Sequence, residues 1–438
     1  MSRIKKIVQL FIDIFKTQYF GFVQGHSYLS KIQVKNIKYI LNEGDSEEIT
    51  KQYEKKFASI IGNGYGVSFA SGRMGFYTLM QVLNIGKGDE VIMQGSTCSV
   101  MPNAVLRTGA KPVFADIDPD TFGSSPNAIK KNITSRTKMI VAQHSFGIPC
   151  KIDKIVEIGK KHNIFILEDS AITLDSSLDG IKVGNWGDAA LFSTDHSKPL
   201  NSLIGGFIYT KNKEIYKKLV KYNEQLPQLD KDHQKRLFKQ FLYERKYYSP
   251  RKYALGIGLM SIKNKFYKLH SKKSEYTFLT ADYTKSTKNK NVTYPYPAKL
   301  PAFLAQLGIY EIDRWDSEKA ERKKLLRDYI TLSEKLGFKE YLPAAYFNPR
   351  LKIVPLRFVF TYPDVIDIRR KMSRFIDINW FWFQKPIICC DDPEEFDYKW
   401  GSCNISETIG EKIINWPCVL THKYDQRLLE KFQDVFNA

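Results

Sequence analysis

Short apolar runs and helical stretches alternate along the first half of the chain. Apolar runs typical of buried strands stand at VSFA (67–70), EVIM (90–93), PVFADI (112–117), MIVAQ (139–143), IFILED (164–169) and AALFST (189–194). Helical stretches lie between several of them, at 102–107, 126–132 and 152–161. This alternation predicts an α/β fold with a mostly parallel sheet and helices on both faces.

The two ends of the chain have different patterns. Apolar residues recur at helical spacing over 3–20, with polar and basic residues largely on the other side. This predicts an amphipathic helix that either packs on the protein or lies on an anionic lipid surface. From about 296 the pattern predicts helices at 300–315, 318–336 and 424–436 and strands within 353–362. We therefore divide the chain into a lead-in (1–35), a large domain (36–295) and a small α+β domain (296–438).

Positive charge is concentrated in one segment, 211–292. It holds 21 Lys and Arg against 7 Asp and Glu, which is 14 of the 20 net positive charges of the 438-residue chain. Tyr and Phe are interleaved with this charge, as in FLYERKYYSPRKY. Three interpretations stay open: a solvated face, a surface that lies on an anionic membrane, and a wall that holds a long anionic substrate. Nucleic acid is disfavoured because no binding motif accompanies the charge.

Cysteines and apolar runs exclude several classes of protein. The six cysteines show no CxxC pair and no zinc spacing, so we expect reduced thiols, no disulfide framework and no metal site. The vicinal pair Cys389-Cys390 leaves a redox or metal role open. No apolar run reaches the roughly 18 residues that span a bilayer, and the N-terminus lacks a signal-peptide cleavage pattern. We therefore expect a cytoplasmic protein, with a peripheral position at the inner face of the membrane as a variant.

Four short motifs lie in connections beside the predicted strands. They are ASGRMG (70–75), Glu168-Asp169, FSTDHSK (192–198) and IGG (204–206). A Gly-containing turn before a helix can present backbone N–H groups to an anion, and a carboxylate at the end of a parallel strand lies where open α/β sheets bind ligands. A lysine in a partly dry site can form a Schiff base with a carbonyl compound. Each motif also has a structural explanation on its own: a common turn, a helix cap or a surface lysine.

Taken together, these motifs and their order resemble the DegT/DnrJ/StrS family of pyridoxal-phosphate (PLP) sugar aminotransferases. Further blocks that resemble the family are GKGDEVIM (86–93), NAVLRTGAKPVFADIDPDTF (103–122), ITSRTKMIVAQHSFG (133–147), VGNWGDAALFST (183–194) and GGFIYT (205–210). The resemblance implies the PLP-dependent transferase fold of type I. That fold has a mostly parallel sheet of about seven strands, helices on both faces and a smaller α+β C-terminal domain.

The resemblance also implies which residues hold the cofactor. Lys198 matches the lysine that bonds PLP, and Asp169 matches the carboxylate that pairs with its pyridine nitrogen; both are the expected catalytic residues. Gly72 and Arg73 lie on the turn that meets the cofactor phosphate, and Ser193 matches a serine beside that phosphate.

Three further residues complete the expected cofactor site. His144 falls in the family's His-x-aromatic-Gly stretch, His196 lies two residues before the lysine, and Cys98 stands where many members place an aromatic ring over the cofactor. The chain also departs from the family pattern. Ile172 replaces a glutamine, and Pro297 replaces an asparagine that reaches the partner subunit's cofactor.

The activity implied by the resemblance is transfer of an amino group from an amino acid, L-glutamate first, to a keto-sugar. The sugar would be linked to a nucleotide diphosphate or a lipid carrier, in surface polysaccharide or glycoconjugate biosynthesis, and the protein would be a homodimer. Two other functions stay open. Members with lyase or dehydratase activity carry histidine in place of the lysine, so His196 keeps that alternative in view. A non-catalytic, membrane-associated member would explain the departures at Cys98, Ile172 and Pro297.

Overall fold

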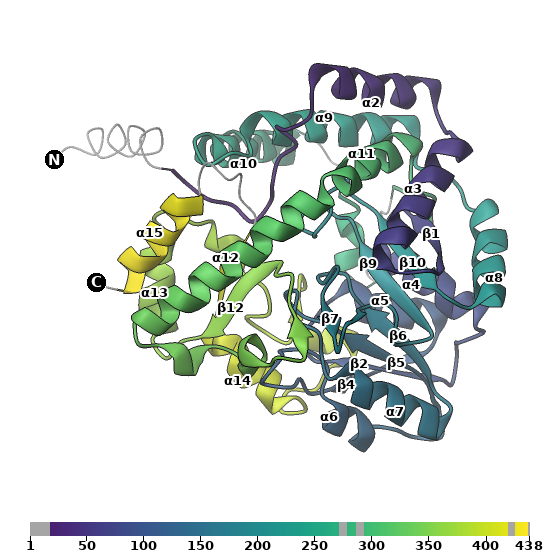
Figure 1. Ribbon diagram of the computed structural model, residues 1–438. Coiled ribbons are helices and arrows are strands. Elements are labelled where there is room, and N and C mark those ends of the chain that lie inside the picture. The colour runs from purple at the N-terminus through teal and green to yellow at the C-terminus, as the bar shows by residue number, and fades with distance from the viewer. Residues whose placement is uncertain (1–17, 271–277, 286–292, 419–424, 437–438) are drawn as a thin grey trace.

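A computed structural model describes residues 18–270, 278–285, 293–418 and 425–436. Its centre is a seven-stranded sheet in the order β1-β10-β9-β6-β5-β2-β4 (Figure 1). The strands are β1 (Tyr65–Phe69), β2 (Glu90–Gln94), β4 (Lys111–Ala115), β5 (Thr137–Gln143), β6 (Phe165–Asp169), β9 (Ala189–Ser193) and β10 (Gly206–Thr210). Only β10 runs antiparallel to its neighbours β1 and β9, so the predicted mostly parallel sheet is confirmed.

Helices cover both faces of the sheet because its strands are apolar on both sides. One face packs against α6 (Pro126–Lys131) and α7 (Ile152–His162), through a core that includes Ile140, Ile155 and Ile166. The main core lies on the other face and includes side chains of α2 (Lys31–Glu43), α3 (Glu47–Ile61), α4 (Gly72–Val82), α5 (Val100–Thr108), α8 (Lys213–Glu224) and α11 (Ala302–Asp313), with α2 packed on α11. The predicted helices at 102–107, 126–132 and 152–161 are therefore present as α5, α6 and α7.

A smaller unit follows α11 and has its own apolar core. Its strands β12 (Arg357–Thr361) and β14 (Ile413–Pro417) pair antiparallel. Around them lie α12 (Trp315–Lys335), α13 (Val365–Met372), α14 (Asn404–Lys412) and α15 (Asp425–Phe436). Trp416, Tyr329 and Phe432 are at the centre of this core. The short strand β13 (Ile387–Ile388) crosses back to pair in parallel with β3 (Thr97–Cys98) of the large unit.

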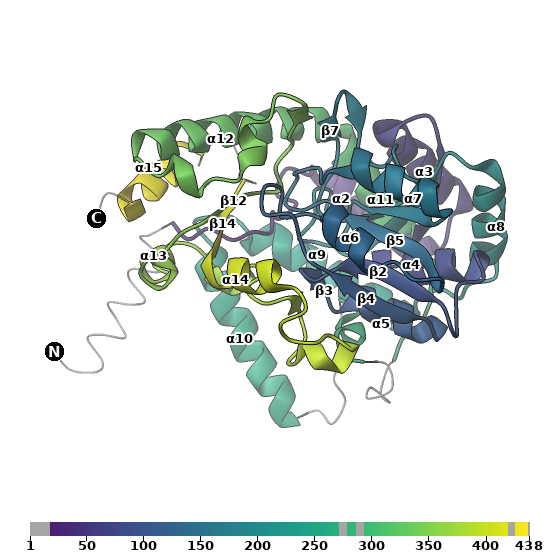
Figure 2. The same ribbon diagram turned by 90° about the horizontal axis from the view of Figure 1, so that it is seen from below.

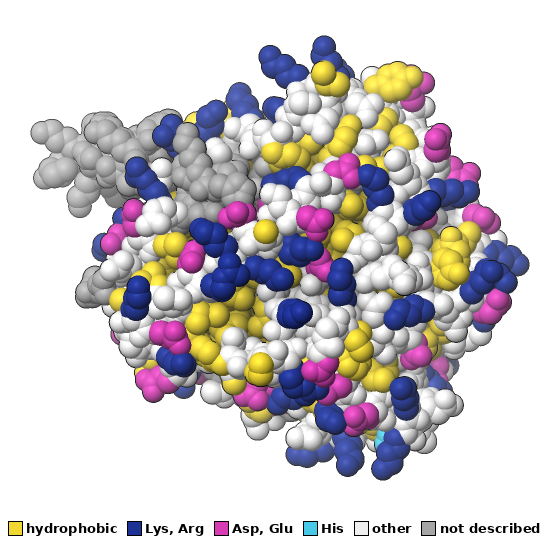
Figure 3. Space-filling model, viewed as in Figure 1, with side chains coloured by type: hydrophobic (Ala, Val, Ile, Leu, Met, Phe, Trp, Pro, Cys, Tyr) yellow, Lys and Arg dark blue, Asp and Glu magenta, His cyan; other side chains and the backbone are white. Residues whose placement is uncertain are grey.

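The basic segment 211–292 is built into the large unit over much of its length. It contributes α8, α9 (Lys231–Tyr247), α10 (Tyr253–His270) and a short 3-10 helix, η1 (Thr280–Tyr283). Leu237 and Phe241 of α9 are fully buried in the main core, so this part is more than a solvated face. In contrast, α10 projects away from the body of the molecule (Figure 2). Lys and Arg side chains are spread over the face shown in Figure 3 rather than gathered in one patch.

The predicted helix at 3–20 lies almost entirely outside the described residues. Of that range, 18–20 is described and is extended, with Phe20 forming a bridge to Ile376 of the small unit. No helix in the described ranges is long and apolar enough to cross a bilayer. The domain limits at 35 and 295 stay predictions, although α11 packs its buried side chains into the core of the sheet.

Candidate active site

A cavity of about 800 Å³ opens at the carboxyl ends of the parallel strands. Four parts of the chain line it: the turns after the strands, the loop 193–205, the insert helices α9 and α10 with η1, and residues 379–389 of the small unit. Ligands bind at this edge in open α/β sheets because the connecting loops and helix N-termini converge there.

Lys198 lies on the long loop that joins β9 to β10 and faces this cavity. The loop is held by backbone bonds from Ser202 to Thr194 (2.9 Å) and from His196 to Leu203 (3.0 Å). The Lys198 ammonium lies 4.7 Å from the centre of the Trp382 ring, a cation–π distance. Its amine is therefore fixed by the small unit as well as by its own loop.

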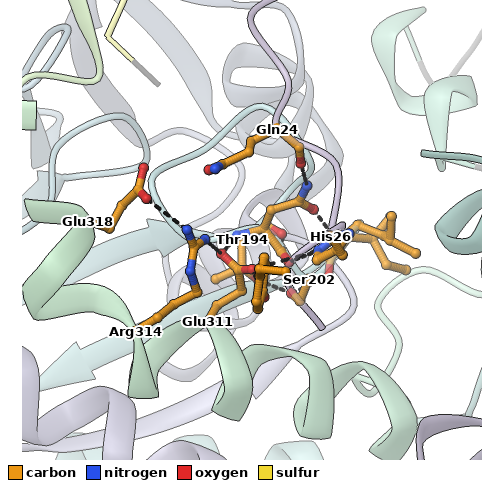
Figure 4. A network of polar contacts seen from close by, with 11 residues as sticks. Gln24, His26, Thr194, Ser202, Glu311, Arg314 and Glu318 are labelled. Atoms are coloured by element: carbon orange, nitrogen blue, oxygen red, sulfur yellow. Dashed lines mark hydrogen bonds and ion pairs between the residues drawn. The ribbon is translucent and has the colours of Figure 1, made fainter. Parts of the chain in front are cut away.

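The N-terminal segment clamps the same loop from the other side (Figure 4). Nε2 of the buried His26 lies 2.8 Å from the carbonyl oxygen of Asn201, and the Asn201 amide donates to the carbonyl of Gln24 at 3.0 Å. Glu311 of α11 accepts from the Asn201 backbone N–H at 3.5 Å and lies 3.8 Å from the Arg314 guanidinium. Residues 24–26 are thus part of the structure that positions Lys198.

Asp169 ends β6 and is buried at the floor of the cavity. Its Oδ1 accepts a hydrogen bond from the Ala171 N–H at 3.0 Å. Burial raises the pKa of the carboxyl, and the nearby Lys198 ammonium opposes that rise. A buried carboxylate of this kind gains stability from a cationic partner, such as a protonated ring nitrogen.

The N-terminus of α4 provides an anion site on the cavity wall. Ser71 caps the helix, yet its hydroxyl is buried and has no hydrogen-bond partner among the described residues. A Cβ on Gly206 would lie 2.2 Å from the Gly72 nitrogen, so only glycine at 206 leaves room beside this terminus. Ser193 lines the same wall, where its hydroxyl donates to the Gly205 carbonyl at 3.3 Å. An unpartnered hydroxyl at a helix N-terminus fits a phosphate group.

Arg73, predicted beside that phosphate, is held by the insert. Its Nε donates to Asp282 Oδ2 at 2.7 Å, and its Nη2 donates to the Leu279 carbonyl at 2.5 Å. Arg107 approaches the other oxygen of Asp282 at 3.1 Å. The guanidinium borders the cavity, but its charge is largely compensated by Asp282.

His144 does not line the cavity. It is fully buried, with Nε2 3.1 Å from Glu168 Oε2 and Nδ1 accepting from the Cys150 N–H at 3.1 Å. Glu168 also accepts from the backbone N–H groups of Gly184, Trp186 and Gly187, each at 2.8 Å. The pair therefore anchors the strand end that carries Asp169. A role of His144 in direct cofactor contact stays a prediction.

Cys98 does line the cavity, and a second cysteine lies beside it. Cys389 follows the pairing partner of Cys98 in β13 and also faces the cavity. A hydrogen bond from the Cys389 thiol lowers the pKa of Cys98 to about 7, with help from the Val100 N–H and Lys198. The aromatic faces come from another part of the chain, WFWF at 380–383, which the motif comparison missed. The high density of aromatic residues in this segment was the feature of the sequence that could have identified it.

Of the predicted site residues, Gly72, Arg73, Cys98, Asp169, Ser193, His196 and Lys198 all line one cavity. The departures Ile172 and Cys98 lie there too, whereas Pro297 follows a cis peptide bond with Tyr296 beside the α4 turn, where Ala70 donates to the Ala298 carbonyl at 3.0 Å. Among the described residues no group of three or more His, Cys, Asp or Glu side chains could hold a metal ion.

The fold is that of the PLP-dependent transferases of type I. Solved structures share it over most of their length: DesV of S. venezuelae (TM-score 0.68, 19% identity, 92% of this chain and 95% of that one) and PseC of Helicobacter pylori (TM-score 0.69, 17% identity, 96% and 100%). A sugar aminotransferase of Streptococcus pneumoniae solved in its PLP form has a TM-score of 0.69 at 19% identity, over 96% of this chain and 99% of that one. At these identities the likeness shows the fold.

The model of the DegT/DnrJ/EryC1/StrS aminotransferase family matches residues 31–241, slightly less than half of this chain. The resemblance expected from the motifs is thereby confirmed. GDP-perosamine synthase of Escherichia coli O157:H7 is 34% identical over 175 residues, 40% of this chain and 48% of the relative. The spore coat polysaccharide biosynthesis protein SpsC of Bacillus subtilis is 35% identical over 169 residues, 39% and 43%. The matched region thus spans about half the length of these relatives.

Proposed function

We propose that this chain is a PLP-dependent aminotransferase that moves an amino group from L-glutamate to the ketone of a carrier-linked sugar. The observation that carries the proposal is one cavity with three features. The Lys198 amine and the buried Asp169 carboxylate face it, and the unpartnered Ser71 hydroxyl lies at the helix N-terminus in its wall. These are the groups that PLP requires: an amine for its aldehyde, a carboxylate for its ring nitrogen and an anion site for its phosphate.

Each residue then has a defined task. When bound, the cofactor supplies an electron sink for the charge left as a proton leaves the donor's α-carbon. Asp169 would hold the ring nitrogen protonated, and its burial would make that pairing strong. Lys198 would take the α-proton of the donor as general base and return it as general acid. Ser71, Gly72 and Ser193 would hold the cofactor phosphate.

A sugar as the amino acceptor is supported by the names of the relatives. Besides GDP-perosamine synthase and SpsC, an L-glutamine:2-deoxy-scyllo-inosose aminotransferase of Streptomyces fradiae is 33% identical over 174 residues, 39% of this chain and 41% of the relative. Polysaccharide or glycoconjugate biosynthesis is therefore the proposed setting, and a homodimer the proposed assembly. The name of the S. fradiae relative makes L-glutamine the second donor to test.

A peripheral position on an anionic membrane is a further part of the proposal. It is supported by the projecting α10, on which Leu259 and Ile262 are 40% and 56% exposed, and by the basic character of the insert. Met260 of the same helix lines the cavity, so α10 connects the exposed apolar side chains with the site that a lipid-linked acceptor would enter.

The test is the visible absorbance of the purified chain after addition of PLP, followed by excess L-glutamate. We expect an absorbance band from cofactor bound through Lys198, and bleaching of that band by glutamate. Lys198→Ala should lower the rate at which glutamate bleaches the band at least a thousandfold, because the substitution removes the group that transfers the proton. Lys211→Ala, an exposed lysine after β10, is the matched control and should behave as wild type. A wild-type band that neither glutamate nor glutamine changes would contradict the proposed activity.

A further inference from the structure

The insert places a buried carboxylate behind the cavity, and the roles assigned above leave it unused. Glu244 of α9 is fully buried, and its Oε1 lies 3.1 Å from Nδ1 of His196. Gln240, one turn earlier on α9, donates to the same oxygen at 3.0 Å. A buried carboxylate is costly without a cationic or hydrogen-bonding partner, so this pairing is a specific feature of the site.

His196 is oriented by this contact and by aromatic rings. The ring of Phe278 lies 4.2 Å from the imidazole, centre to centre, and the ring of Trp380 meets it edge to face at 5.2 Å. With Nδ1 facing Glu244, Nε2 is the nitrogen left for a ligand, since its nearest carboxylate oxygen, Asp195 Oδ1, is 3.9 Å away. His196 lines the same cavity as Lys198 and Asp169.

The charges around His196 decide what it can bind. Burial lowers the pKa of the imidazole and Lys198 adds to that effect, but the carboxylates of Asp195 and Glu244 outweigh both, so the net shift is upward. A protonated ring is a hydrogen-bond donor at both nitrogens. The carboxylates of Asp195 and Glu244 balance the imidazolium and the Lys198 ammonium, so this group has no net positive charge to attract a carboxylate, and it favours a neutral carbonyl or hydroxyl oxygen.

We propose that His196 and Glu244 form the centre of the acceptor-sugar subsite, in which His196 Nε2 donates a hydrogen bond to a carbonyl or hydroxyl oxygen of the sugar. Glu244 is the positioning residue, and Phe278 and Trp380 supply flat apolar walls for the sugar ring. The subsite rests on the proposed function. Because Glu244 and Phe278 belong to the insert, the insert would determine which sugar enters.

The first test needs neither cofactor nor acceptor. The imidazole of His196 is titrated by NMR in the full-length chain labelled with ¹⁵N-histidine, and its signal is identified with His196→Gln. We expect Glu244→Gln to lower the His196 pKa, as loss of an adjacent opposite charge does. Glu214→Gln, the same change at an exposed site on α8, should leave it unchanged. An unchanged His196 pKa in Glu244→Gln would overturn the proposed pairing of His196 with Glu244.

The second test measures sugar binding by fluorescence of the cavity tryptophans, with UDP-glucose, GDP-mannose and free D-glucose as probes on the PLP-loaded chain. We expect at least one probe to bind wild type, and His196→Gln to weaken it ten- to a hundredfold, the effect of losing one charged hydrogen bond. Glu244→Gln, which keeps the shape of the side chain, should weaken it less. Equal affinity in all variants, or no binding of any probe by wild type, overturns the subsite.

The bleaching of PLP absorbance by L-glutamate separates this proposal from the proposed function. If the proposed activity is wrong, wild type shows no glutamate response while the His196 titration and probe binding still give their expected results. If only the subsite is wrong, glutamate bleaches the band in wild type and in His196→Gln alike, and the probe affinities do not differ.

Discussion

At the scale of single residues, the cavity brings together reactive groups from neighbouring loops and side chains from distant parts of the chain. Lys198 and Asp169 stand in local motifs next to strands, so chain order alone placed them at one edge of the sheet. Trp382, 184 residues after Lys198, lines the same cavity, and Glu244, 46 residues after Lys198, lies behind it against His196. No local pattern shows which distant segments will meet. The aromatic side chains at 380–383, which line the cavity although position 98 has no aromatic ring, were therefore not predicted.

One prediction at this scale concerns the thiol of Cys98. Its pKa of about 7 depends first on the hydrogen bond from Cys389, which Cys389→Ala removes. We expect Cys389→Ala to slow alkylation of Cys98 by iodoacetamide at pH 7 about tenfold, because the thiolate fraction falls as the pKa returns toward 8.5. Peptide mapping by mass spectrometry measures the rate.

Cys390→Ala is the control for the loss of a neighbouring thiol, because Cys390 Sγ bonds the Ile387 carbonyl at 3.3 Å. A rate at Cys98 that falls equally in Cys390→Ala and Cys389→Ala would show that the Cys389 hydrogen bond is not the cause.

At the scale of elements, helices and strands of the α/β half followed from the apolar periodicity, but the insert did not. Its charge density favoured a solvated or membrane-facing surface, whereas α9 buries Leu237 and Phe241 and η1 holds Arg73 through Asp282. A count of charged residues does not separate the apolar face of an amphipathic helix from its charged face. For this reason the net charge did not indicate that α9 is partly buried.

The contact between α3 and β1 is predicted to make the free energy of unfolding depend on pH. Glu54 of α3 accepts from the N–H and the hydroxyl of Ser68, both at 2.7 Å, and burial raises its pKa to about 7. In the unfolded chain this carboxyl ionises near its ordinary pKa of about 4.3, so between these values the folded state binds more protons. The free energy of unfolding therefore falls as pH rises from about 4.3 to 7.

Glu54→Gln removes the ionisable group and with it this fall in the free energy of unfolding. The glutamine side chain still has an oxygen that can accept hydrogen bonds from Ser68. We expect the gain in unfolding free energy of Glu54→Gln over wild type to be about 2 kcal/mol larger at pH 8 than at pH 5, measured by urea denaturation. Glu48→Gln, at an exposed position of the same helix, should show no such difference. Equal effects of Glu54→Gln at both pH values would be evidence that Glu54 ionises normally.

At the scale of the whole molecule, the net charge of +20 and the exposed apolar side chains of α10 predict binding to an anionic membrane surface. We expect the full chain to sediment with vesicles of phosphatidylglycerol and phosphatidylcholine, and to be released by salt, because the attraction includes screened charge. Leu259→Ser with Ile262→Ser should reduce the bound fraction several-fold without changing PLP binding, since both side chains are exposed on the projecting α10.

Vesicles of phosphatidylcholine alone are the control and should bind little protein. Deletion of residues 1–17 tests the amphipathic pattern of the N-terminus separately. Binding to anionic vesicles that neither the α10 substitutions nor the deletion reduces would contradict the peripheral position.

The clamp of Gln24 and His26 on the lysine loop bears on how this protein should be cut and tagged. The family match begins at residue 31, and an expression boundary placed there would keep every motif residue. It would also remove the two residues that hold Asn201, three positions after Lys198. Such a fragment would contain every motif residue but would lack the contacts of Gln24 and His26 that hold the loop of Lys198 in place. Truncated forms should therefore begin before residue 18, and fusion partners are better placed at the C-terminus.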